Sequence, residues 1–251
     1  MLKQTKQIFL IVFISLMGTH TYADNPKDWW VNIANNRVEQ VKKMLDNGAD
    51  PNEISPNGQP AIMYAIREDA WDVYELLVND NRTALNAINI NRETPLMYLT
   101  VIGETKRAKD LIKKGAMVNR EGWTPLHYAA STGKTDTALM LLQHGANVNA
   151  RAHDGTTPLM MAAYAGSIDT AKLLLENGAD PNLKTSQGYD VNDWAAFKSN
   201  TKLAVEIKRF INKDTTSQPV AKESNTLIDQ NDEGSPSRYF NIDREYEPVT
   251  P

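Results

Sequence analysis

The chain has 251 residues, of which 41% are hydrophobic and 23% are charged, a length that suits one large folded domain. It contains no cysteine, which excludes thiol catalysis, disulfide bonds and metal sites built on pairs of cysteines. The formal net charge is −4 and no basic stripe is visible, so nucleic acid is not an expected ligand.

The first predicted element is a targeting segment. Lys3 and Lys6 precede a largely apolar run over residues 8–17, and the sequence Thr21-Tyr22-Ala23 suits signal peptidase. The run is about half of the roughly 20 residues that a membrane-spanning helix needs, which makes a retained anchor the weaker alternative. We therefore predict cleavage after Ala23, with no membrane attachment of the mature chain.

The central part of the sequence repeats itself. Thr124–His127 reads Thr-Pro-Leu-His and Thr157–Met160 reads Thr-Pro-Leu-Met, 33 residues further on, while Thr94–Met97 opens another unit. A threonine cap followed by proline begins a helix, and Gly145 and Gly178 are predicted to end the leucine-rich second helices. We count about four full repeats between atypical ends, and such units must stack because none can bury its apolar face alone.

The period breaks at three places. Asn119 to Thr124 spans five positions where Asn149 to Thr157 spans eight, so the loop before Trp123 is predicted to be a tight turn. Residues 79–93 lack the Gly-Ala-Asp of the other units, which predicts an irregular exit from the second unit. The last unit lacks Thr-Pro, and there Asp190 is expected to cap instead.

Residues 214–251 are predicted to be a disordered acidic tail. They contain three basic and eight acidic residues, a net charge of −5, with few aliphatic side chains. The segment Arg238–Ile242 is more apolar than its surroundings. Docking of this segment on a partner, or on the repeats themselves, remains an alternative to a fully solvated tail.

Over residues 29–210 the chain resembles ankyrin-repeat proteins. The opening Asp28-Trp29-Trp30 and the stretch 118–128 are similar to exported ankyrin-repeat proteins of Gram-negative bacteria. The resemblance implies an all-α solenoid of helix-turn-helix units with short β-hairpin or finger loops. The predicted organisation is a signal peptide over 1–23, an ankyrin-repeat domain over 24–213 and the tail over 214–251.

The resemblance also implies a surface for protein recognition, at the finger tips and at the ends of the first helices. Aromatic and basic side chains at or near these positions have the character of an interface hot spot. They are Trp123, Tyr164, Tyr189, Phe197, His153, Arg120, Arg151 and Lys184. For Tyr189 and Phe197 the alternative is that they cover the core of the last repeat.

No catalytic residue, cofactor site or metal site is predicted. His127 is expected to bond locally within its Thr-Pro-Leu-His string, and Met63, Met97, Met160 and Met161 are expected to fill the core. The predicted function is a non-catalytic adaptor of the bacterial periplasm, a monomer that binds an unidentified protein. A secreted effector that binds host proteins is the alternative, and an enzyme is the least favoured class.

Overall fold

The computed structural model describes residues 25–197, 204–205 and 207–210. The predicted signal peptide and acidic tail lie outside these residues. Residues up to Thr83 belong to one compact unit, and residues from Ala84 onward belong to a second. Within the described ranges, no helix is long and apolar enough to cross a membrane.

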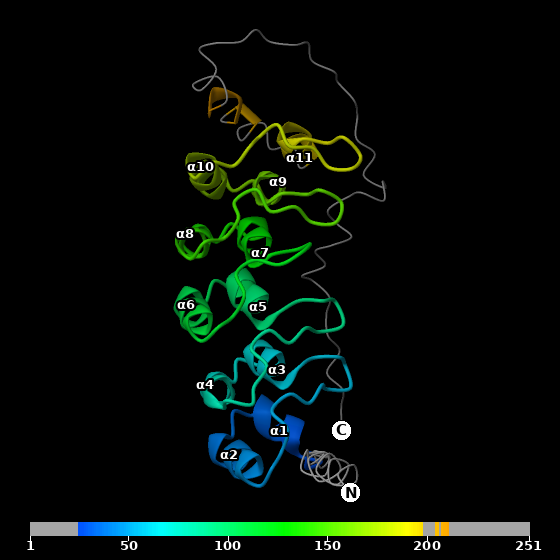
Figure 1. The fold of residues 1–251 in the computed structure, drawn as a ribbon, viewed down its shortest axis with the longest axis vertical. Coiled ribbons are helices and arrows are strands. Elements are labelled where there is room, and N and C mark those ends of the chain that lie inside the picture. Colours follow the sequence, from blue (N-terminus) through cyan, green and yellow to red (C-terminus); the bar gives the residue numbers. More distant parts are fainter. Residues whose placement is uncertain (1–24, 198–203, 206, 211–251) are drawn as a thin grey trace, which may run out of the picture. The chain divides into compact units, whose positions relative to one another are not determined.

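The first unit contains two helix-turn-helix pairs. Its helices are α1 (Trp29–Ala34), α2 (Val38–Asp46), α3 (Ala61–Arg67) and α4 (Trp71–Asn79). Helix α1 packs on α2 and α3, and α4 packs on α2 and α3, so the two pairs are stacked (Figure 1). Trp29, Ile33, Ile62, Met63 and Leu77 are fully buried between them and form the core.

The second unit has the same arrangement in three helix-turn-helix pairs, followed by α11 and by a helical stretch over residues 207–210. Its helices are α5 (Pro95–Ile102), α6 (Thr105–Lys113), α7 (Pro125–Ser131), α8 (Thr135–Gln143), α9 (Pro158–Ala165), α10 (Ile168–Glu176) and α11 (Val191–Phe197). In Figure 1, α5, α7, α9 and α11 form one row and α6, α8 and α10 a second, with loops projecting from the first row. The predicted all-α repeat solenoid is thereby confirmed.

Local sequence sets where these helices begin and end. Thr94, Thr124 and Thr157 have extended backbones, each followed by proline as the first helical residue. The hydroxyl of Thr157 accepts the amide hydrogen of Met160 at 3.3 Å. Gly145 (φ 82°) and Gly178 (φ 88°) follow the last residues of α8 and α10 in the left-handed conformation. The predicted starts and stops are confirmed.

Asparagine side chains join consecutive loops within each unit. In the second unit Asn119 donates its side-chain amide to the carbonyl of Gly145 at 2.7 Å and accepts the amide hydrogen of Asn147 at 2.8 Å. Asn86 and Asn149 make the same pair of bonds one repeat before and after. In the first unit, Asn25 bonds both the carbonyl and the amide hydrogen of Asp50. These bonds satisfy backbone groups that the helix ends leave unpaired.

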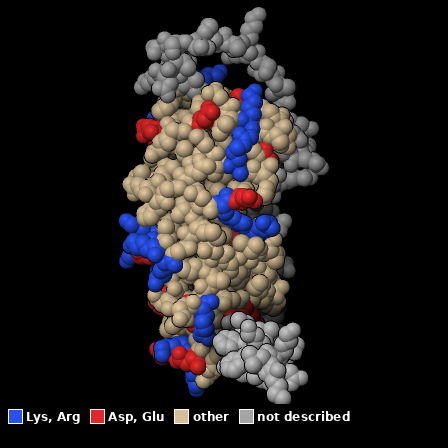
Figure 2. All heavy atoms as spheres, in the orientation of Figure 1, with Lys and Arg blue, Asp and Glu red and all other residues tan. Residues whose placement is uncertain are grey.

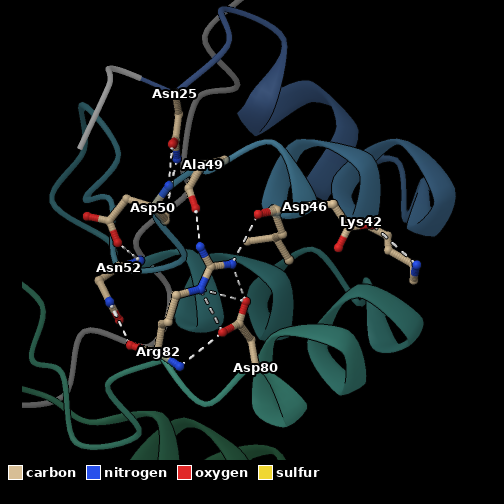
Figure 3. Close-up of polar contacts among 9 residues, drawn as sticks. Asn25, Lys42, Asp46, Ala49, Asp50, Asn52, Asp80 and Arg82 are labelled. Carbon is tan, nitrogen blue, oxygen red and sulfur yellow. Dashed lines mark hydrogen bonds and ion pairs between the residues drawn. The ribbon is translucent and has the colours of Figure 1, made fainter. Parts of the chain in front are cut away.

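An arginine stabilises the irregular exit from α4 (Figure 3). The Arg82 guanidinium donates to the carbonyl oxygens of Leu45 and Ala49, each at 3.3 Å, and its Nε lies 2.9 Å from Oδ1 of Asp80. The carbonyl of Arg82 in turn accepts the side-chain amide of Asn52 at 2.9 Å. The predicted irregular exit over residues 79–93 is confirmed, and the hydrogen bonds of Arg82 stabilise its first part.

Candidate protein-binding surface

Three loops of the second unit close as fingers with the same backbone pattern. The first residue of each finger donates its amide hydrogen to the carbonyl of the fifth, as Asn89 does to Glu93 at 3.0 Å and Ala152 to Thr156 at 2.9 Å. Thr185 and Tyr189 close the third finger in the same way. The recurring geometry places the intervening residues at the tips.

The finger over residues 89–93 has an arginine where the other two have glycine. The fourth residue is left-handed in each finger, with φ of 62° at Arg92, 86° at Gly155 and 90° at Gly188. An L-residue other than glycine adopts this conformation at a cost of about 1 kcal/mol. Arg92 therefore occupies a backbone position that its neighbours fill without that cost, and such outliers gather at functional sites.

The finger over residues 119–123 is short, as predicted. The chain bends at residues 121–123, with Gly122 at φ 74°. On one side, the Arg120 guanidinium donates to the carbonyl of Arg92 in the preceding finger. On the other, the His153 ring lies against Gly122, where a Cβ would stand 2.8 Å from the imidazole Nε2. The short finger thus contacts both of its neighbours, through its own Arg120 on one side and the His153 ring on the other.

Aromatic rings gather beside the short finger. Trp123 is half-buried and meets His127 edge to face at a centroid distance of 5.1 Å, and Tyr128 at 6.4 Å. The Tyr128 hydroxyl donates to a Glu93 carboxylate oxygen at 3.1 Å, and burial and this carboxylate raise the pKa of Tyr128. The Trp123 ring therefore has a packing role against His127 and Tyr128, in addition to the binding role predicted for it.

The carboxylate of Glu93 is held by groups other than the nearby arginines. Its second oxygen accepts the side-chain amide of Asn89 at 2.7 Å, and the same amide lies 3.2 Å from the Tyr98 hydroxyl. Among the described residues, neither Arg92 nor Arg120 forms an ion pair. Burial, and then the charge of Arg92, lower the pKa of Arg120. Two neighbouring cations are left uncompensated.

Exposed aliphatic side chains lie in the finger of Arg92 and directly before it. Ile90 at the tip is 71% exposed, and Ile88 is 42% exposed. We call Ile90, Arg92, Arg120 and Trp123 the central finger surface; they lie in the finger over residues 89–93 and in the short finger, which the hydrogen bond from Arg120 to the Arg92 carbonyl joins to it. Ile90 and Arg92 were absent from the predicted site because the family pattern was read from finger glycines, and this finger has none. The alternating Ile88-Asn89-Ile90-Asn91 is the signal that could have found them.

The remaining predicted residues lie further along the second unit. Arg151 donates to the carbonyl of Lys184 at 2.7 Å, joining the last two fingers, and both side chains are exposed. The amide hydrogen of Tyr189 lies 3.2 Å from the Thr185 hydroxyl, and the Tyr189 side chain is half-buried. Of the predicted residues, the structure therefore brings Arg120, Trp123 and His153 to the short finger and joins Arg151 to Lys184 beside the next two fingers.

Two further predicted residues, Tyr164 of α9 and Phe197 of α11, contact each other. The Tyr164 ring meets Trp194 at 6.1 Å and Phe197 at 6.4 Å between centroids. Trp194 is buried, whereas Tyr164 and Phe197 are half-buried. Tyr164 of α9 thus joins that helix to α11 through two rings, and an interface role for Tyr164 and Phe197 stays a prediction.

His127 has the structural role predicted for it. It is fully buried, with Nδ1 accepting the amide hydrogen of Thr124 at 3.1 Å and Nε2 lying 3.0 Å from the carbonyl oxygen of Thr156. Because Nδ1 is the acceptor, the imidazole proton is on Nε2. Desolvation by burial lowers the pKa of His127 to about 4, so the ring is neutral.

The methionines also have their predicted place. Met63, Met97, Met160 and Met161 are buried in the core, and the Met97 sulfur accepts the amide hydrogen of Thr94 at 3.4 Å. Within the part of the chain that the structure describes, no group of three His, Asp or Glu side chains is arranged to hold a metal ion.

Comparison with known proteins gives a consistent match. A family model described as ankyrin repeats matches three times, over residues 30–120, 73–152 and 103–185, which together extend over more than half of the chain. Alpha-latrocrustotoxin-Lt1a of Latrodectus tredecimguttatus is 31% identical over 90 residues, which are 36% of this chain and 6% of the toxin. The Neurogenic locus Notch protein of Drosophila melanogaster is 35% identical over 80 residues, 32% of this chain and 3% of that protein. The chain thus spans a small fraction of the length of these relatives.

Proposed function

The chain belongs to the ankyrin-repeat family, whose stacked repeats present extended surfaces for protein binding, and we propose that it is a non-catalytic adaptor of the bacterial periplasm. It binds its partner protein as a monomer, through the central finger surface. One observation carries this proposal. An exposed aliphatic side chain, Ile90, and two guanidinium groups that form no ion pair among the described residues, Arg92 and Arg120, lie in two consecutive fingers, the second of which contains the half-buried Trp123.

That combination matches the composition of interface hot spots. Trp, Tyr and Arg are enriched there, and an apolar centre with a charged rim is the usual anatomy of a protein interface. The left-handed Arg92 supports the same reading, because the chain retains an arginine where glycine would be less strained. His153, against Gly122, extends the surface toward the next finger.

The other cationic surface of the second unit is a weaker candidate. Figure 2 shows basic side chains gathered at the level of α6, whose sequence contains Lys106, Arg107, Lys109 and Lys113. Two of these pair with acidic side chains of their own segment, Arg107 with Glu104 at 2.6 Å and Lys113 with Asp110 at 2.9 Å. A solvated helix face explains this pattern without a partner.

Export is supported by the amino-terminal sequence. The basic residues, the apolar run and the small residues before Asp24 together favour a cleavable signal. Cell fractionation followed by sequencing of the mature amino terminus tests this part of the proposal. The periplasmic fraction should contain a chain that begins at Asp24. Recovery from the culture medium alone would favour the secreted effector instead.

A pair of matched substitutions tests the binding surface. We expect Ile90→Asp, in the mature chain used as bait, to weaken capture of the partner from a periplasmic extract at least about tenfold, the effect of losing a typical hot-spot contact. Leu139→Asp on α8 introduces the same charge at another exposed aliphatic side chain and should leave capture unchanged. Binding is quantified by titrating the captured protein against each variant.

Equal capture by the two variants would place the partner elsewhere on the chain. The choice of Ile90 avoids a difficulty with Trp123, whose ring packs on His127 and Tyr128. Trp123→Ala would therefore change packing together with binding. Circular dichroism of Ile90→Asp should match that of the unsubstituted chain, because the side chain is 71% exposed.

A further inference from the structure

The two arginine side chains of the central finger surface favour binding of a negatively charged group. Arg92 and Arg120 lie close together, since the Arg120 guanidinium bonds the Arg92 carbonyl, and no described carboxylate neutralises either. Glu93, next to Arg92 in sequence, is engaged by Tyr128 and Asn89, and Glu121, next to Arg120, forms no ion pair with either arginine. Arginine recognises carboxylates through paired, charge-assisted hydrogen bonds, so a carboxylate-bearing segment fits this surface.

The chain itself carries such a segment. Residues 214–251 have a net charge of −5, from eight acidic and three basic residues. Near their end, Tyr239 and Phe240 precede the sequence Asp243-Arg244-Glu245-Tyr246-Glu247, in which Tyr246 lies between two glutamates. Acidic and aromatic groups close together in sequence complement a surface that combines two arginines with Trp123 and the exposed Ile90.

We propose that the acidic tail, residues 214–251, binds the central finger surface of its own chain and competes there with the partner protein. This inference rests on the proposed function for the identity of the shared surface. It adds a regulatory element, because a partner must displace the tail before it binds.

The length of the tail is sufficient for this contact. A flexible chain of roughly 40 residues has a root-mean-square span of about 35 Å. Helix α5, which follows the finger of Arg92, is three packed first-row helices away from α11, and packed helices lie about 8–10 Å apart. Tethering at this span gives the tail an effective concentration in the millimolar range, so that even a weak contact is populated.

The cationic face of α6 is the competing destination within the same unit. Its Arg107 and Lys113 already have acidic partners, whereas Arg92 and Arg120 have none among the described residues. The finger surface also offers Ile90 and Trp123 to the aromatic residues of the tail. Charge and apolar contact together therefore favour the fingers.

The absence of cysteine makes a direct distance measurement simple. Ser237→Cys in the tail and Asn91→Cys at the finger tip introduce the only two thiols of the chain, for labelling with a fluorescent donor and acceptor. We expect efficient energy transfer between them at low ionic strength. Transfer should fall when salt is raised from about 0.01 M to about 1 M, which shortens the Debye length from about 30 Å to about 3 Å.

Charge reversal identifies the tail's docking site. Arg92→Glu with Arg120→Glu should abolish the efficient transfer, and Arg92→Glu alone, which keeps the Arg120 side chain in place, should reduce it. Lys106→Glu with Lys109→Glu on α6 makes the same change in net charge and should leave transfer unchanged. Transfer that is insensitive to salt and to the finger variants would overturn the proposal, as would its loss in the α6 variant.

Capture of the partner separates this inference from the function on which it rests. Neutralising the tail with Asp243→Asn, Glu245→Gln and Glu247→Gln should increase partner binding about two- to tenfold, as expected when a tethered competitor at millimolar effective concentration is removed. Unchanged capture by this variant would refute competition while leaving the binding surface intact. Whether the partner binds the central finger surface at all is tested by its capture with Ile90→Asp, a substitution outside the tail.

Discussion

Replacing His127 by alanine is expected to lower the free energy of unfolding of the second unit by about 3–4 kcal/mol, as measured by urea denaturation followed by circular dichroism. The ring is fully buried and joins the start of α7 to the finger before α9. Its loss leaves the amide hydrogen of Thr124 and the carbonyl of Thr156 without their partners, together with a cavity. It also removes the ring against which Trp123 packs.

The neighbouring repeats supply a matched variant. Met97 in α5 and Met160 in α9 occupy the position of His127, and the Met97 sulfur accepts the amide hydrogen that caps its helix. His127→Met keeps most of the volume and the capping acceptor but cannot donate to Thr156. We expect it to cost about 1–2 kcal/mol, the range for a single buried group left unsatisfied. A loss as large as that of His127→Ala would contradict the role given to the hydrogen bond from Nε2.

The same residue predicts a pH dependence. The pKa of His127 is lowered to about 4 in the folded chain, from an ordinary value of 6.5. Between these values the unfolded chain binds a proton that the folded chain does not, so stability is complete above pH 6.5 and falls as the pH drops toward 4, by up to about 3 kcal/mol. His127→Met should flatten this part of the stability profile. A variant with the unaltered slope would show that other groups cause it.

Arg82→Ala is expected to destabilise the first unit by about 2 kcal/mol, since one charged group provides hydrogen bonds to two carbonyls and to Asp80. The hydrogen bond from Arg82 is the main cause of the lowered pKa of Asp80. A lowered carboxyl pKa stabilises the fold above the ordinary value and loses that contribution as the pH falls through the folded-state value. The Arg82 variant should therefore be less sensitive to acid in that range. Urea denaturation at several pH values provides the measurement.

Lys113→Ala is the control for Arg82→Ala. Lys113 also pairs with an aspartate, Asp110 at 2.9 Å, but both side chains are about half exposed and the lysine bonds no carbonyl of another helix. Water screens exposed pairs of this kind, so we expect Lys113→Ala to leave the free energy of unfolding nearly unchanged. If the two variants lose the same stability, Arg82 is an ordinary surface pair and another contact maintains the irregular exit.

The sequence alone was sufficient to predict features that depend on residues only a few positions apart. A threonine before a proline and a glycine after a leucine-rich stretch specify helix ends within four residues, and the helices begin and end there. The shortened finger could be predicted because the span from Asn119 to Thr124 is three residues shorter than the span from Asn149 to Thr157. The role of His127 followed from a hydrogen bond to a residue three positions away.

Contacts between repeats were beyond the reach of the sequence. Asn119 bonds residues 26 and 28 positions away, and Arg82 bonds carbonyls 33 and 37 positions away. Such partners become neighbours only when the repeats stack. For the same reason the pairing of Arg120 with Arg92 was not foreseen, and Ile90 was missed because family contact positions specify places on a scaffold, not which side chains are exposed there.

The most direct test of the binding surface is photo-crosslinking in intact cells of the source organism. A photoreactive amino acid replaces Ile90 at the finger tip in one variant and Gln143, an exposed residue at the end of α8, in the other. The central finger surface predicts a discrete crosslinked protein from position 90 and none from position 143. Equal crosslinking from both positions, or crosslinking from position 143 alone, would contradict it.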